Sequence, residues 1–355
     1  MRIAQVAPLY ESVPPKLYGG TERVVSTLTE ELVRRGHEVT LFASGDSMTS
    51  ARLVPCCPES LRLDPNCKDE LSHHILMLEQ VFSEKDNFDI VHFHIDYLHF
   101  PLSRCHGIVN VTTLHGRLDT PDLQPLYRVF DDMPVVSISD AQRAPLPWIN
   151  WRGTVYHGYA RNRYQFHSDS DGYLAFLGRV SPEKGLDQAI EIAKTAGKKL
   201  KIAAKVDRAD QEYFDSSIRQ KLDHPLIEFI GEIGYPDKCE FLGKADALLF
   251  PINWPEPFGL VMIESMACGT PVIAYPQGSV PEIMSHGVSG FVVDGVESAA
   301  RAVHDIKDID RAECRRYFES RFTDTRMTDD YLTIYERLVG EEPETLTLSD
   351  GVSVG

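Results

Sequence analysis

The sequence predicts an α/β protein built from two doubly wound, Rossmann-like domains that face each other across a cleft. Short apolar runs alternate with amphipathic helical stretches along nearly the whole chain. This alternation is typical of parallel sheets that helices cover on both faces. A polar stretch near the middle interrupts the alternation. At 355 residues the chain is also too long for one ordinary core, which favours two domains.

In the first half of the chain, six apolar runs have the length and composition of buried strands. These runs are Ile3–Ala7, Val39–Ala43, Ile90–His94, Val109–Leu114, Val135–Ile138 and Thr154–Tyr156. The stretches between several of them have helical periodicity, as at Thr21–Arg35, which ends at Gly36, and at Glu70–Phe82. The first half is therefore expected to form one complete sheet with its helices.

The polar stretch, residues 158–172, reads GYARNRYQFHSDSDG and has no apolar periodicity, so it is interpreted as an interdomain linker. A second series of strands is expected at Tyr173–Leu177, Leu200–Ala204, Ile227–Ile230, Ala247–Pro251, Val272–Ala274 and Phe291–Val293. Residues 297–339 are expected to be helical throughout. We predict an N-terminal domain at 1–157, a C-terminal domain at 173–322, a helix at about 323–340 that joins the first domain, and a flexible tail at 341–355.

Composition and charge exclude several classes of protein. The formal net charge is -17, and neither half of the chain is basic, so we expect no nucleic-acid partner. Membrane association is not indicated, since there is no run of about 18 apolar residues and neither half of the chain carries the net positive charge that favours an anionic lipid surface. The start of the chain lacks the features of a signal peptide, which favours a cytoplasmic protein. The seven scattered cysteines are expected to be free thiols. The oligomeric state is left open.

The first candidate motif, GRVSPEKG at residues 178–185, lies between an apolar strand and an amphipathic helix. It places Arg179 and Lys184 at the carboxyl edge of the second sheet, where doubly wound folds bind their ligands. Arginine offers a planar fork to phosphate oxygens, and lysine offers a compact positive charge. The motif therefore predicts an anion site, although an ordinary strand–helix turn with solvated charges remains the alternative.

The second candidate motif, NWPEPFGLVMIESMACGTP at residues 253–271, predicts a short helix between two buried strands. Gly259 allows close approach of a ligand to the helix start, where the dipole favours an anion. Glu256 precedes the helix and Glu264 lies two turns into it. A carboxylate in such an apolar helix needs a partner, which could be a sugar or ribose hydroxyl or, alternatively, a lysine or arginine of the protein. For Glu256 the alternative is a solvated loop residue.

Taken together, the two motifs closely resemble those of the family 4 retaining glycosyltransferases, over roughly residues 1–340. The resemblance implies the GT-B type of fold. It implies that Arg179 and Lys184 bind the diphosphate of a nucleotide-sugar donor and that Glu264 holds the ribose hydroxyls. It further implies that Glu256 contacts the transferred sugar. Backbone amides of the segment Phe258, Gly259 and Leu260 are then expected to approach the sugar and phosphate.

Shorter motifs agree with this resemblance. The loop with Gly19 and Gly20 follows the first predicted strand and resembles the family's loop near the diphosphate, although it could also be a tight turn without a ligand. His115 ends a strand of the first domain, where the family places a histidine beside the sugar; a strand-end histidine bonded to backbone is the alternative. The loop with Gly231 and Ile233 borders the nucleotide base by analogy.

Two further positions are weaker matches to the family. At the expected hinge, Tyr159 and Ala160 depart from the family's pattern, which puts a functional use of the aspartate that usually follows there in doubt. The turn with Pro281 and Glu282 matches a family feature and is interpreted as structural.

A metal site is considered because His92, His94 and Asp96 alternate along a predicted strand. The family commonly has a similar strand end and generally works without a catalytic metal. Neither candidate motif contains an Asp-x-Asp pair that would hold Mg²⁺ on a diphosphate. We therefore expect no metal and no other cofactor.

The sequence thus predicts a metal-independent retaining glycosyltransferase that uses a UDP-, GDP- or ADP-sugar and a hydroxyl acceptor, such as a glycan, a polysaccharide precursor or a natural product. Its expected catalytic residues are His115, Glu256, Arg179 and Lys184. The alternatives are a nucleotide-sugar epimerase or hydrolase of the same fold and a non-catalytic nucleotide-sugar-binding protein. A dinucleotide oxidoreductase is disfavoured because the G-x-G-x-x-G fingerprint is missing.

Overall fold

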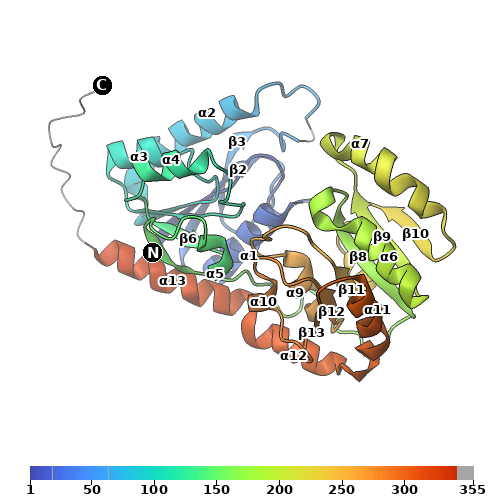
Figure 1. Cartoon of the computed structure of the whole chain (residues 1–355). Coiled ribbons are helices and arrows are strands. Elements are labelled where there is room, and N and C mark those ends of the chain that lie inside the picture. Colours follow the sequence, from blue (N-terminus) through green and yellow to red (C-terminus); the bar gives the residue numbers. More distant parts are fainter. Residues whose placement is uncertain (18, 63, 342–355) are drawn as a thin grey trace.

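The computed structural model describes residues 1–17, 19–62 and 64–341, which form two parallel sheets with helices on their faces (Figure 1). The first sheet has the strand order β3-β2-β1-β4-β5-β6-β7, and the second has the order β10-β9-β8-β11-β12-β13. In both sheets the order reverses beside the first strand of the series. Ligands of doubly wound sheets bind at this switch point, beyond the carboxyl ends of the strands.

The strands of the first sheet are β1 (Arg2–Val6), β2 (Glu38–Ser44), β3 (Arg52–Cys57), β4 (Ile90–Phe93), β5 (Asn110–Thr113), β6 (Val135–Ser137) and β7 (Trp151–Thr154). Its helices are α1 (Gly20–Arg34), α2 (Glu70–Ser83), α3 (Phe100–His106), α4 (Leu123–Val129) and α5 (Asp140–Arg143). The sequence missed β3, which lies at the edge of the sheet and is only partly buried. The strand expected at Thr154–Tyr156 was wrong, because the chain pairs with β6 over Trp151–Thr154 instead.

The strands of the second sheet are β8 (Tyr173–Arg179), β9 (Lys199–Lys205), β10 (Ile227–Gly231), β11 (Ala245–Phe250), β12 (Val272–Ala274) and β13 (Gly290–Val292). The helices that follow them are α6 (Leu186–Ala196), α7 (Gln211–Tyr213), α8 (Asp237–Gly243), α9 (Leu260–Ala267), α10 (Val280–Ile283) and α11 (Val296–Asp305), then α12 (Arg311–Arg321) and α13 (Asp324–Gly340). Residues 297–339 are therefore not helical throughout, because breaks at residues 309–310 and 322–323 separate the last three helices.

Each sheet has an apolar core on both of its faces, which explains why its strands are apolar throughout. On the first sheet, α1 and α13 pack on one face and α2 on the other. On the second sheet, α9 and α12 pack on one face, and α6 and α11 pack on the other. Because side chains alternate along a strand, neighbours such as Leu174 and Ala175 belong to the two opposite cores.

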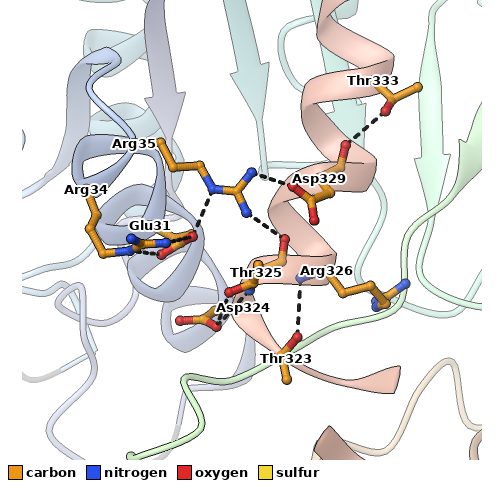
Figure 2. Close-up of polar contacts among 9 residues, drawn as sticks. All are labelled: Glu31, Arg34, Arg35, Thr323, Asp324, Thr325, Arg326, Asp329 and Thr333. Atoms are coloured by element: carbon orange, nitrogen blue, oxygen red, sulfur yellow. Dashed lines mark hydrogen bonds and ion pairs between the residues drawn. The ribbon is translucent and has the colours of Figure 1, made fainter. Parts of the chain in front are cut away.

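The last helix, α13, leaves the second sheet and packs against the first (Figure 1). Thr323 caps its start by accepting the N–H of Arg326 at 3.3 Å. Arg35 at the end of α1 joins the two helices: its guanidinium contacts Asp329 at 2.5 Å and the carbonyl of Thr325 at 2.8 Å (Figure 2). Figure 2 also shows Glu31 of α1 holding the same arginine at 2.8 Å. These contacts hold the first turns of α13 against the end of α1.

The chain therefore crosses between the two sheets twice, and the two crossings lie side by side. Tyr159 and Thr323 form a parallel bridge, with the N–H of Tyr159 donating to the carbonyl of Phe322 at 2.9 Å. The stretch 158–172 has a polar sequence, but it is not fully exposed to solvent. Its Tyr159 and Tyr164 are both buried in the core between the second sheet and helices α9 and α12. The domain boundaries remain predictions. The predicted tail, apart from Glu341, lies outside the described residues.

Gly158 is required for this close crossing. A Cβ at this position would lie 2.2 Å from the carbonyl oxygen of Thr323. We expect Gly158→Ala to push the two crossings apart and to lower the free energy of unfolding by about 1–3 kcal/mol, as overpacking does. A thermal melt checks this. Gly340→Ala is the control because a Cβ there meets no atom within 4 Å; equal melting temperatures for the two variants would contradict the prediction.

Among the residues that the structure describes, none of the helices combines the length and the apolar composition needed to cross a bilayer. The seven cysteines are all free, as the sequence predicted.

Candidate active site

A cleft of about 550 Å³ lies between the carboxyl edges of the two sheets. Its walls come from the ends of strands and the segments that follow them, at β1, β3, β5, β6 and β7 of the first sheet and at β8, β9, β10 and β11 of the second. The predicted site residues that line it are Gly19, Gly20, His115, Arg179, Lys184, Ile233, Glu256, Phe258, Gly259, Leu260 and Glu264. Gly231 ends β10 and is not among the lining residues, whereas its neighbour Glu232 is.

Two helix starts meet in this cleft. Helix α1 begins at Gly20 after Gly19, and α9 begins at Leu260 after Gly259, whose φ is +78°. The two starts are in close reach, since a Cβ on Gly20 would lie 3.2 Å from the Leu260 side chain. Neither Gly19 nor Gly259 has a side chain that could cap its helix, so N–H groups at both helix starts can donate to an external acceptor. The positive ends of two dipoles therefore favour an anion at this point.

The two predicted cations lie on the wall formed by the second sheet. Lys184 Nζ lies 2.5 Å from Glu256 Oε2 and 4.9 Å from the ring centre of Trp254. Arg179, at the end of β8, lies 2.6 Å from Glu183 and 3.4 Å from Asp210. Each cation is thus held at the cleft by carboxylates of its own wall. An anion bound at the helix starts would compete with these carboxylates for the positive charges.

Glu256 is 8% exposed, so the alternative of a solvated loop residue is wrong. Its Oε2 accepts the Trp254 indole N–H at 2.9 Å as well as the Lys184 contact. Arg117 of the first sheet's side stacks on the same indole at 5.5 Å from the ring centre. No role was predicted for Trp254, yet its indole N–H holds one oxygen of the predicted sugar-binding carboxylate.

Glu264 is 3% exposed and has three partners from the protein. The hydroxyls of Tyr164 and Tyr159 donate to it at 2.8 and 3.2 Å, and Lys238 Nζ lies 3.2 Å away. Burial alone raises the pKa of Glu264, but Lys238, Arg23 and the Tyr164 hydrogen bond outweigh it and hold the pKa below its ordinary value. The carboxylate is therefore ionised, and the ion pair left open by the sequence is present.

The sequence missed the three partners of Glu264. The sequence indicated only that a carboxylate in an apolar helix needs a hydrogen-bonding or charged partner. Tyr159 and Tyr164 come from the polar stretch after the first sheet, and Lys238 comes from α8. None of the three is near Glu264 in the sequence, so only the folded chain brings them together.

His115 follows β5 and lines the cleft beside His157, whose ring stacks on it at 5.3 Å. Desolvation lowers the pKa of His115 to about 3, so the ring is neutral at physiological pH. Its Nε2 lies 2.9 Å from Nδ1 of His94, and Nε2 of His94 lies 2.9 Å from Oε1 of Gln5. Since Gln5 Oε1 can only accept, the chain of donors assigns the His115 proton to Nε2. The remaining nitrogen, Nδ1, is then an acceptor.

The histidines considered for a metal have partners in the protein instead. His92 contacts the hydroxyls of Tyr335 and Thr113 at 2.6 and 2.8 Å, and His94 contacts Gln5 and His115. The strand ends at Phe93, so Asp96 does not continue the predicted alternation, and it is exposed. The described part of the chain contains no group of three or more histidine, cysteine or acidic residues that could hold a metal ion.

The wall formed by the first sheet carries acidic groups that the sequence did not single out. Glu22, in the first turn of α1, is 5% exposed, and burial raises its pKa to about 7. Glu11 is also buried and forms an ion pair with Arg62. This wall thus adds two buried acidic side chains to a cleft whose other wall carries Arg179 and Lys184.

Comparisons with known proteins agree with this arrangement. Residues 161–321 match the family model of the glycosyl transferases group 1, and residues 18–165 match that of glycosyltransferase family 4. The N-acetyl-alpha-D-glucosaminyl L-malate synthase of Bacillus anthracis is 26% identical over 360 residues, covering 89% of this chain and 93% of that protein.

Solved structures share the fold at lower identity. Sucrose-phosphate synthase from Thermosynechococcus elongatus has a TM-score of 0.78 and 18% identity, covering 95% of this chain and 98% of that one. HepE from Anabaena, solved with UDP and glucose, has a TM-score of 0.72 and 17% identity, with 95% and 100% covered. These likenesses show a GT-B fold of two facing Rossmann-like domains.

Proposed function

Because the chain belongs to the family 4 glycosyltransferases, we propose that it transfers a sugar from a nucleoside-diphosphate donor to an acceptor hydroxyl with retention at the anomeric carbon. The observation that carries the proposal is the meeting of two helix starts with Arg179 and Lys184 in one cleft. A diphosphate needs several N–H donors and positive charges around one point, and this is where the cleft supplies them.

The donor is proposed to lie along the wall of the second sheet. Its diphosphate would accept from the helix starts at Gly20 and Leu260 and pair with Arg179 and Lys184. Its ribose hydroxyls would donate to Glu264, sharing that carboxylate with Lys238. The base would lie toward Glu232 and Ile233, which line the same wall. We take UDP as the first candidate, since HepE was solved with UDP and with UDP-glucose; GDP and ADP are tested beside it.

The proposed reaction needs no protein nucleophile. The bond from the anomeric carbon to the diphosphate oxygen breaks, and the acceptor oxygen forms its new bond on the same face of the sugar. The acceptor proton passes to the departing phosphate oxygen. Negative charge grows on the diphosphate during this step, so Arg179, Lys184 and the helix starts stabilise the transition state more than the ground state.

Two side chains would orient the sugar. Lys184 and Trp254 both hold Oε2 of Glu256, which leaves Oε1 to accept a sugar hydroxyl. Neutral His115 offers Nδ1 as an acceptor on the opposite wall. We propose that the reaction is metal-independent because the protein's own cations occupy the diphosphate site.

Lys184→Ala tests the diphosphate site. We expect kcat/KM to fall by about 10²- to 10³-fold, the cost of losing one electrostatic contact to a growing oxyanion. Release of nucleoside diphosphate from UDP-glucose, GDP-mannose and ADP-glucose measures it, in EDTA and with a panel of sugar acceptors. Lys194→Ala is the control, because Lys194 pairs with Glu191 on α6 outside the cleft.

A thermal-shift screen with UDP, GDP, ADP and NAD(H) accompanies these assays. A ligand at 100 times its Kd should add about 2.7 kcal/mol of stability. The proposal fails if no nucleoside diphosphate stabilises the protein, or if Lys184→Ala and Arg179→Ala respond as the unaltered protein does. Donor cleavage that no acceptor in the panel accelerates would favour a hydrolase, and binding without turnover would favour a non-catalytic protein.

A further inference from the structure

Glu282, in the first turn of α10, belongs to the part of the chain that forms the second sheet, and its side chain contacts a helix of the first sheet. Its carboxylate accepts the backbone N–H groups of Asp140 and Ala141 at 2.8 and 2.6 Å, and the Tyr156 hydroxyl donates to it at 3.2 Å. Asp140 and Ala141 form the first turn of α5, which follows β6 of the first sheet. A helix leaves its first N–H groups without partners, and here a carboxylate from the facing sheet satisfies two of them.

On one side, Glu282 is tied to the loop that carries Glu256. The N–H of Ser279, three residues before Glu282, donates to the carbonyl of Glu256 at 2.9 Å, and its hydroxyl donates to the carbonyl of Phe258 at 2.9 Å. Gly278 packs so tightly on this loop that a Cβ would lie 2.4 Å from the Glu256 backbone. The turn with Glu282 and the loop with Glu256 are therefore held together by backbone contacts.

On the other side, α5 holds the backbone around His115. Gln142 of α5 is 5% exposed, and its amide N–H₂ donates to the carbonyls of Leu114 and Gly116, both at 2.8 Å. Its side-chain oxygen accepts the N–H of Ile138 at 2.9 Å. Carbonyls on both sides of His115 are thus fixed by one side chain of the helix that Glu282 caps.

We propose that Glu282 is a positioning residue that sets His115 of one wall against Glu256 of the other. The inference rests on the proposed glycosyl transfer for its catalytic consequence, and on the described hydrogen bonds for its geometry. A continuous path runs from the Glu256 loop through Ser279 and Glu282 to α5 and Gln142. Misplacing reacting groups by about 1 Å can cost about 100-fold in rate. A residue that fixes the position of one wall relative to the other can therefore have a large effect on kcat.

Glu282→Ala and Glu282→Gln test the proposal. In the glutamine variant only one side-chain oxygen remains to accept, so one N–H of α5 loses its partner. We expect kcat to fall about 10- to 100-fold for the alanine variant and less for the glutamine variant. The Kd for the nucleoside diphosphate should stay within about twofold, because Arg179, Lys184 and Glu264 are unaltered. Glu297→Ala, an exposed glutamate in the first turn of α11, is the matched control.

A second readout does not depend on turnover. The ring signals of His115 in nitrogen-15 NMR spectra, assigned with His115→Asn, should shift in both Glu282 variants and stay in place in Glu297→Ala. Unchanged His115 signals and unchanged kcat in Glu282→Ala would overturn the proposal, as would equal losses in Kd and kcat. If the His115 signals shift but the unaltered protein turns over none of UDP-glucose, GDP-mannose and ADP-glucose, the positioning role stands and the proposed transfer reaction fails.

Discussion

Replacing Glu264 with alanine should both destabilise the protein and remove its affinity for a nucleoside diphosphate. The carboxylate is buried and is the partner of Lys238, whose side chain is only 14% exposed. Alanine leaves this ammonium without its anion and two tyrosine hydroxyls without their acceptor. Breaking one partner of a buried pair costs about 3–5 kcal/mol. The proposed ribose contacts add a loss in affinity of about 100-fold, from two hydrogen bonds to a charged group.

Thermal melts with and without UDP measure both effects, and GDP and ADP extend the measurement. Glu264→Gln separates them: the amide keeps the size of the side chain and can still accept from Tyr164, but it cannot neutralise Lys238. We expect an intermediate loss of stability and a nearly complete loss of the ligand response. Glu313→Ala is the control, because this glutamate pairs with Arg316 on the surface of α12. A ligand response in Glu264→Ala equal to that of the control would remove Glu264 from the donor site.

The second large effect is acid sensitivity. Burial lowers the pKa of His92, His94, His99 and His157 well below the ordinary value, and that of His115 to about 3. The unfolded chain therefore binds protons at these rings below pH 6.5 while the folded chain does not, so stability falls as the pH falls. Between pH 6.5 and 5.5 each ring should cost about 1 kcal/mol.

Two acidic groups act in the opposite direction. Desolvation raises the pKa of Glu22 to about 7 and that of Asp96 to about 6, so the folded protein takes up these protons more readily than the unfolded chain. Over the same interval it gains about 1 kcal/mol from Glu22 and somewhat less from Asp96, which is more exposed to solvent. The net loss is then about 3 kcal/mol, which should lower the melting temperature by roughly 4 °C. Besides burial, hydrogen bonds disfavour a second proton on two of the rings. Gln5 orients the shared protons of His94 and His115, and a second proton would remove the acceptor between the two rings.

Thermal melts at pH 7.5, 6.5 and 5.5 test this effect. His99→Gln should reduce the loss by about one histidine's share, since His99 is fully buried between Ser103 and Thr112. His304→Gln, on the exposed face of α11, should leave the pH dependence as it is. A melting temperature that is the same at pH 5.5 and 7.5 would mean that the buried rings take up protons in the folded protein.

Local sequence patterns are enough to predict the two-sheet architecture and the position of most strands. Continuous apolar runs between helical periods leave few alternatives, because a parallel sheet buries both faces and needs helices to connect its strands. The same patterns predict that Arg179, Lys184, Glu256 and Glu264 lie at one edge of the second sheet. Strand ends and helix starts are local features, and the carboxyl ends of parallel strands lie at one edge of a sheet. The edge strand β3 was not predicted, because a partly buried strand lacks a continuous apolar run.

The partners of these residues could not be predicted, because they depend on how the folded chain packs. Glu264 receives its donors from Tyr159, Tyr164 and Lys238, and Glu282 reaches the N–H groups of Asp140 and Ala141 from the facing sheet. These contacts join residues that are distant in sequence, and no periodicity or spacing records them. The sequence pattern predicts that a side chain is buried or charged. The group that pairs with a buried charge depends on how the two sheets and the two crossings between them pack, which is a property of the whole fold.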